Sequence, residues 1–77
     1  MAKTAETLAK IPESCKMQLN LFSICYKQGR DSNNGEIKEM YIQKLRGYAK
    51  CLLDMGIFDV NDVSNLILWV VSGHIIE

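Results

Sequence analysis

The sequence predicts an all-α protein, a small three-helix bundle formed by a single domain. Two observations predict this class: apolar residues recur at steps of three and four along most of the chain, and glycine-containing breaks separate the periodic stretches. A length of 77 residues suits one domain. The expected helices cover roughly residues 12–28, 36–55 and 60–72, and residues 1–11 form an arm or a short extra helix.

The breaks between the expected helices have the composition of turns. Residues 29–35, written GRDSNNG, consist mostly of turn-forming residues bounded by glycines, which predicts a loop. In the second break, residues 55–59, Gly56 suits the left-handed position that follows a helix end. Asp59 then suits the N-cap of the next helix, and Asp62 favours its positive first turn.

The outer ends of the bundle carry similar signals. Pro12 suits the first turn of a helix, because its missing N–H has no partner there. Gly73 is expected to end the last helix, unless that helix continues through residues 74–77. Residues 17–25, MQLNLFSIC, alternate for a few positions as a strand would, but the helical spacing spans more residues and a helix is expected.

The helix expected at 36–55 has one apolar face and one polar face. Arg46 and Lys50 lie one turn apart on the polar face, a spacing that would suit phosphate groups. Glu39 and Asp54 share that face, and mixed charge favours an ordinary solvated surface over a nucleic-acid site. The apolar face contains Ile37, Tyr41, Leu45, Tyr48, Leu52 and Met55, with Ala49 beside them.

The helix expected at 12–28 is apolar on two sides, which predicts burial on both. The stripe expected to face the bundle core contains Met17, Leu21, Ile24 and Cys25. The second stripe contains Cys15, Leu19, Phe22 and Tyr26.

The helix expected at 60–72 repeats this arrangement. Its core face contains Val60, Val63, Ile67, Val70 and Val71, with Leu66 at the edge. Leu68 and Trp69 point elsewhere, and Ile76 would join Trp69 if the helix continued. Either the helix at 12–28 or the N-terminal arm covers the Trp69 side of this helix within the chain, or the second stripes of the two helices form an interface with another chain. The residues expected to form such an interface with a partner or a second copy are Cys15, Leu19, Phe22, Tyr26, Leu68, Trp69 and Ile76.

Composition argues against several classes of site. Three widely spaced cysteines without a signal peptide fit free thiols in a cytoplasmic protein, and a single histidine without a CxxC pair predicts no metal. No apolar run is long enough to span a membrane. Residues 1–50 hold nine bases and five acids, whereas residues 51–77 hold four acids and no base, so the two halves carry opposite charge.

No enzyme or cofactor signature is recognisable in the sequence. Gly29 and Gly35 do not match a phosphate-binding loop, and no small-molecule substrate is indicated. A nucleophile pair of Cys51 or Cys25 with His74 is conceivable, but packing in the core is the expected role of both thiols. We therefore expect neither catalysis nor a cofactor.

Residues 44–66, KLRGYAKCLLDMGIFDVNDVSNL, carry an Arg-Gly-Tyr helix followed by a Gly-Ile turn and an acidic cap. This stretch resembles a pattern in small uncharacterised helical proteins of Gram-positive bacteria and of their phages and conjugative elements. The resemblance covers 23 of the 77 residues. It implies a small accessory protein of a mobile element, a group that includes transcription regulators and inhibitors of the anti-CRISPR type.

The leading hypothesis is a non-enzymatic protein–protein interaction module, homodimeric, that modulates another macromolecule by occupying its surface. The alternative is a helix-turn-helix regulator of transcription that contacts DNA. The helix expected at 60–72 has no Lys or Arg and presents Asp62 near its start, so Arg46 and Lys50 would have to make the DNA contacts.

Overall fold

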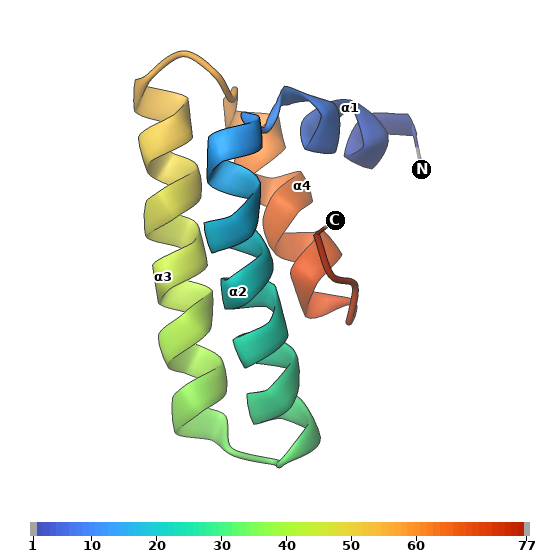
Figure 1. Ribbon diagram of the computed structural model, residues 1–77, viewed down its shortest axis with the longest axis vertical. Helices are drawn as coiled ribbons and strands as arrows, with labels where there is room; N and C mark the ends of the chain where they lie inside the picture. Colours follow the sequence, from blue (N-terminus) through green and yellow to red (C-terminus); the bar gives the residue numbers. More distant parts are fainter. Residues whose placement is uncertain (1, 77) are drawn as a thin grey trace.

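The computed structural model describes residues 2–76, with side chains from Ala5 onward. The fold is all-α, as predicted. Within this part of the chain, α2 and α3 form a long antiparallel pair, α4 packs against both of them, and α1 crosses the end where α4 begins (Figure 1). The four helices are α1 (Ala2–Lys10), α2 (Glu13–Asp31), α3 (Gly35–Asp54) and α4 (Val60–Val71).

The turn between α3 and α4 confirms the prediction from local sequence. Gly56 adopts the left-handed conformation, with φ of 78°. Asp59 caps α4 by accepting a hydrogen bond from the Asp62 N–H at 2.9 Å, and the Asp62 carboxylate accepts one from the Asp59 N–H at 2.9 Å. This reciprocal pair is a capping box. Gly73, with φ of 93°, follows the end of α4 as expected, and residues 74–76 are not helical.

The loop between α2 and α3 is shorter than predicted. The helix continues through Gly29 to Asp31, so only residues 32–34 lie outside the two helices. Gly29 is buried, and a Cβ at this position would lie 2.9 Å from the Ile37 Cγ2 atom. This glycine therefore serves the close approach of α2 to α3. The chain reversal instead uses Asn33, whose φ is 54°.

The N-terminal segment, for which the sequence predicted an arm or a short extra turn, is the nine-residue helix α1. It packs against α4, and Ile11 is buried where α1 gives way to α2. Pro12 precedes the first residue of α2 and acts as its N-cap residue, one position earlier than expected. The bundle thus has a fourth helix that covers one side of α4.

The apolar face predicted for α3 is confirmed at its centre, where Leu45 and Leu52 are buried, but Ile37 and Met55 at its ends are exposed. The core combines residues from all parts of the fold. Its buried apolar members are Ile11, Leu19, Tyr26, Leu45, Ala49, Leu52, Phe58, Leu66, Val70 and Ile76.

The two apolar stripes of α2 are exchanged relative to the prediction. Leu19 and Tyr26 are buried, and the Phe22 ring centroid lies about 6 Å from those of two α3 tyrosines. Met17 and Leu21, which were expected in the core, are 83% and 51% exposed. Since both stripes are apolar, α2 alone does not specify which one faces inward. The inward stripe has the small neighbours Ser23 and Gly29, which let other helices approach closely.

The buried face of α4 is also rotated from the predicted one. Leu66 and Val70 are buried together with Asp62, while Val60 and Val71 are exposed. The sequence prediction was wrong for the two valines because it did not place α1 against the Asp62 side of α4. That helix packs on the Asp62 side of α4 and draws that side inward.

Candidate functional site: the groove between α3 and α4

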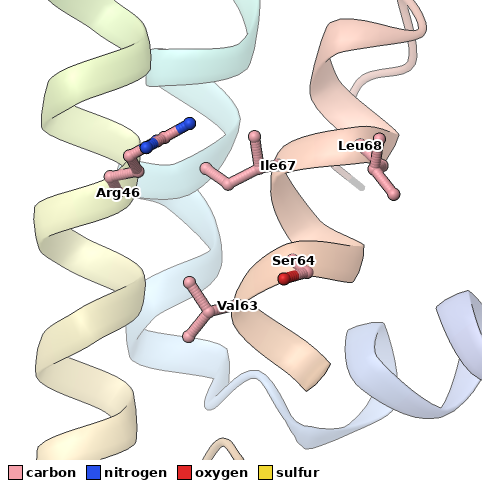
Figure 2. A pocket seen from close by; sticks show the side chains of 5 residues that line it. All are labelled: Arg46, Val63, Ser64, Ile67 and Leu68. Atoms are coloured by element: carbon pink, nitrogen blue, oxygen red, sulfur yellow. The ribbon is translucent and has the colours of Figure 1, made fainter. Parts of the chain in front are cut away.

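Two adjoining hollows of about 400 and 290 Å³ lie between α3 and α4 and share Arg46, Val63 and Ser64. We call this surface the α3–α4 groove. In Figure 2, Arg46 extends from α3 toward α4, and Val63 and Ile67 point from α4 toward α3. The complete lining is Arg46, Lys50, Leu53, Val60, Val63, Ser64, Ile67 and Leu68.

The groove exists because α4 is rotated so that its Asp62 side meets α1. That rotation leaves Val60 and Leu68 on the open side, where they are 70% and 63% exposed. The two residues are separated by about 12 Å of helix, or slightly more than two turns. Between them, Val63 and Ile67 are half-buried and form the apolar wall of the groove.

The charge of the groove comes from α3. Arg46 and Lys50 are exposed and lie one helical turn apart, and no acidic side chain lines either hollow. None of the salt bridges between described side chains uses either of these bases. The groove therefore offers an apolar strip about two turns long beside two cations. The sequence placed Arg46 and Lys50 on a solvated face; it did not place apolar α4 residues next to them.

Six of the seven residues predicted to form an intermolecular interface belong to the chain's own packing, which corrects that prediction. They have this role because the second stripe of α2 is the inward one and because the C-terminal segment folds back onto the bundle. Leu19, Tyr26 and Ile76 are buried, and Cys15, Phe22 and Trp69 pack against the core. Leu68 alone lies on open surface, where it lines the α3–α4 groove.

Trp69 packs within the chain, as in the intramolecular alternative. Its indole ring stacks on His74, with ring centroids 4.2 Å apart. Leu8 of α1 and Ile75 help to line a hollow of about 450 Å³ beside these rings. The indole N–H is buried and has no hydrogen-bond partner among the described residues. His74 thus covers one face of the tryptophan.

A polar cluster, buried at Thr7 and Asp62, joins α1 to the side of α4 that faces away from the groove. Asp62 accepts hydrogen bonds from the Thr7 hydroxyl at 2.6 Å and from the Lys10 ammonium at 2.7 Å. The Asn65 amide donates to the Thr7 hydroxyl at 3.2 Å. Burial alone would raise the pKa of Asp62, but hydrogen bonds from Lys10, Thr7 and the Asp59 backbone outweigh burial and lower the pKa from 3.8 to about 2.

The sequence predicted a role for Asp62 only at the helix start and did not predict this cluster. The available signal was the spacing of Thr7 and Lys10, which places both on one face of α1. The Thr7 hydroxyl and both carboxylate oxygens of Asp62 have hydrogen-bond partners within the chain. The arrangement therefore fixes the position of α1 and does not point to a reaction.

The cysteines occupy different positions from those expected. Cys51 is exposed, which corrects its predicted packing role, and Cys15 and Cys25 are half-buried; all three are free thiols. Hydrogen bonding with the Cys25 thiol raises the pKa of Tyr41, so Cys25 lies beside α3. His74 instead stacks on Trp69, and Cys25 and His74 do not form the conceivable nucleophile pair. The described residues contain no group of three His, Cys, Asp or Glu side chains arranged to hold a metal ion.

Comparison with protein-family models, with curated proteins and with solved structures gives no significant match to this chain. Among the described residues, no helix combines the length and apolarity needed to cross a lipid bilayer.

Proposed function

We propose that this protein is a non-enzymatic protein–protein interaction module whose α3–α4 groove binds an amphipathic helix with acidic residues from a partner protein. The observation that carries the proposal is an exposed apolar strip on α4 beside two cations on α3 that form no salt bridge with any described side chain. The protein would act by binding alone, because a partner helix held in the groove can no longer contact other molecules through the same face.

The apolar half of the groove has the dimensions of a known recognition mode. Helices bind in grooves through side chains spaced at three, four and seven residues, which occupy about two turns. Val60, Val63 and Leu68 present apolar surface over about the same length. Removing this surface from water contributes about 25 cal/mol for each Å² buried on either side of the interface.

The charged half of the groove selects the partner's chemistry. Arg46 and Lys50 follow one wall at a spacing of one turn, so acidic residues one turn apart on the bound helix would face them. Such pairs gain strength where the bound helix excludes water, and they disfavour a basic partner. A neutral or basic helix of equal apolarity should therefore bind more weakly.

Residues 44–66, the stretch that resembles accessory proteins of phages and conjugative elements, supply Arg46, Lys50, Leu53 and most of the α4 wall. This coincidence supports an accessory protein that inhibits or modulates a host factor by occupying its helix. The alternative, a helix-turn-helix DNA-binding regulator, would use Arg46 and Lys50 as phosphate contacts, but Val60 and Leu68 would then remain exposed to water.

The test uses designed helical peptides as probes. One peptide has leucines spaced for the groove and two flanking glutamates, and a second peptide has arginines at the glutamate positions. In ¹H–¹⁵N spectra, we expect the glutamate peptide to shift the amide signals of Val63, Ile67 and Arg46, and the arginine peptide to bind at least about tenfold more weakly.

Matched variants make this test specific to the groove. Arg46→Glu should weaken binding of the glutamate peptide and strengthen binding of the arginine peptide. Lys44→Glu changes charge equally on the other side of α3 and should change neither affinity. Equal affinity for both peptides, or signal shifts confined to other surfaces, would contradict the proposal. Salt-sensitive binding of duplex DNA that is lost in Arg46→Glu would instead support the DNA-binding alternative.

A further inference from the structure

A second apolar surface lies on α2, away from the helices that form the groove. Met17 is 83% exposed and Leu21 is 51% exposed, and Ile24 beside them is half-buried. The steps of four and three residues keep these side chains on one side of α2, opposite the buried stripe of Leu19 and Tyr26. We call Met17, Leu21 and Ile24 the outer stripe of α2.

The spacing of the outer stripe matches the seam by which two helices pack in a coiled coil. From Met17 to Ile24 the stripe extends along about 10 Å of helix, and Leu21 lies near its middle. A second copy of α2 placed antiparallel to the first would bring Met17 of each copy opposite Ile24 of the other. The two Leu21 side chains would then meet near the two-fold axis.

The charges beside the stripe favour this orientation. All the charged residues nearest the outer stripe, Glu13, Lys16, Lys27 and Asp31, lie on the same flank of it, whereas the opposite flank carries the uncharged residues Ser14, Gln18 and Cys25. In an antiparallel pair the same flanks of two copies meet, and in a parallel pair opposite flanks meet. Only the antiparallel arrangement therefore brings charged side chains of the two copies together.

In the antiparallel register set by Met17 and Ile24, Glu13 of one copy lies next to Lys27 of the other. The mismatch along the axis is one residue, or about 1.5 Å of rise, which a lysine side chain easily spans. Symmetry forms this pair twice. The Glu13 carboxylate contacts Lys16 in its own chain at 3.1 Å but its side chain is 89% exposed, so it remains open to a second cation.

We propose that the outer stripe of α2 is a self-association surface on which a second copy of this chain packs antiparallel, with Glu13 of each copy paired to Lys27 of the other. The inference places the homodimer expected from the sequence on a different surface. It leaves the α3–α4 groove of each copy available to a partner protein, so it is independent of the groove proposal.

The first experiment is sedimentation equilibrium over a wide range of protein concentration. The wild-type chain should show reversible dimerisation, and Leu21→Lys should raise the dimer dissociation constant at least about tenfold, because two like charges would meet near the axis. Leu68→Lys is the matched control, since it introduces the same charge at a similarly exposed leucine in the groove and should leave dimerisation unchanged. Circular dichroism verifies that both variants remain folded.

Charge reversal then tests the antiparallel register. Glu13→Lys and Lys27→Glu should each raise the dissociation constant at least about threefold, because each places like charges face to face twice. The double variant restores opposite charges and should return the constant to near the wild-type value. Lys16→Gln removes only the pair within the chain and should not weaken the dimer.

Three results would overturn the inference. One is a wild-type chain that stays monomeric at all accessible concentrations. Another is a dimer that Leu21→Lys leaves intact. The third is a double charge reversal that is weaker than both single variants. Failure here would not affect the groove proposal, because peptide binding by Leu21→Lys reports on the groove separately.

Discussion

The hydroxyl of Thr7 donates a hydrogen bond of 2.6 Å to the buried carboxylate of Asp62, across 55 residues of sequence. The same carboxylate accepts hydrogen bonds from Lys10 and from the Asp59 backbone, so it joins α1 to the start of α4. Because α1 covers this side of α4, the opposite side of α4 is left to form the groove with α3. The position of the candidate site thus depends on a polar contact remote from it.

Thr7→Val should destabilise the fold by about 1–3 kcal/mol, because the replacement keeps the shape but removes the donor to a buried carboxylate and the acceptor of Asn65. Urea denaturation measures this change. Asp54→Asn serves as the control, because Asp54 is an exposed acidic residue of a helix. This variant should change the free energy of unfolding by less than about 0.5 kcal/mol. An unchanged midpoint for Thr7→Val would show that α1 contributes little to holding α4.

The pH dependence of stability follows from the same carboxylate. The pKa of the Asp62 carboxyl is about 2 in the folded chain and 3.8 in the unfolded chain, so the unfolded chain takes up the proton first as the pH falls. The stabilisation, about 2 kcal/mol, is therefore complete above pH 3.8 and is lost as the pH falls toward 2. Asp62→Asn should be less stable at pH 7 and should show a smaller loss between pH 4 and pH 2. Equal acid sensitivity of the two chains would contradict this assignment.

Features that depend on a few neighbouring residues could be predicted from the sequence. Gly56 and Asp59 specify the turn into α4 by local chemistry, namely a left-handed glycine and a side chain that accepts the first free N–H. The central apolar face of α3, around Leu45 and Leu52, was also predictable because that helix has a single apolar side. These elements bring Arg46 and Lys50 to their places at the groove.

Features that depend on contacts between distant segments could not be predicted in this way. Helix α2 has two apolar stripes, and the choice of Leu19 over Met17 for the core is made by α3 and α4 rather than by α2. The rotation of α4 depends on Thr7, whose partner lies far along the chain. The groove was missed for this reason, since its apolar wall consists of residues that the local pattern assigned to the core.

The stacked pair of Trp69 and His74 gives a spectroscopic prediction. Trp69 is half-buried, so its emission should lie to the blue of that of the unfolded chain. His74→Ala removes the ring that covers one face of the indole at a centroid distance of 4.2 Å. We expect a red shift of the emission and a loss of stability of about 0.5–1.5 kcal/mol. Emission that stays unchanged would show that the C-terminal segment does not rest on Trp69 in solution.

Two glycines in long helices should respond to alanine in opposite directions. At Gly29, an added Cβ would lie 2.9 Å from the Ile37 Cγ2 atom and 3.0 Å from the Lys38 backbone nitrogen, so α2 and α3 would have to separate. Gly29→Ala should therefore destabilise the fold by about 1–3 kcal/mol, as overpacking does. At Gly47, which lies in α3, nothing lies within 4 Å of an added Cβ.

Gly47→Ala should accordingly stabilise the chain by about 0.5–1 kcal/mol, because alanine loses less backbone entropy on forming a helix. Thermal unfolding of the two variants beside the wild type gives both values, and helix propensity favours alanine equally at the two positions. Any difference in sign between them therefore measures the close contact of α2 with α3. If Gly29→Ala were as stabilising as Gly47→Ala, α2 and α3 could not lie so close that a Cβ at residue 29 would come within 2.9 Å of the Ile37 Cγ2 atom.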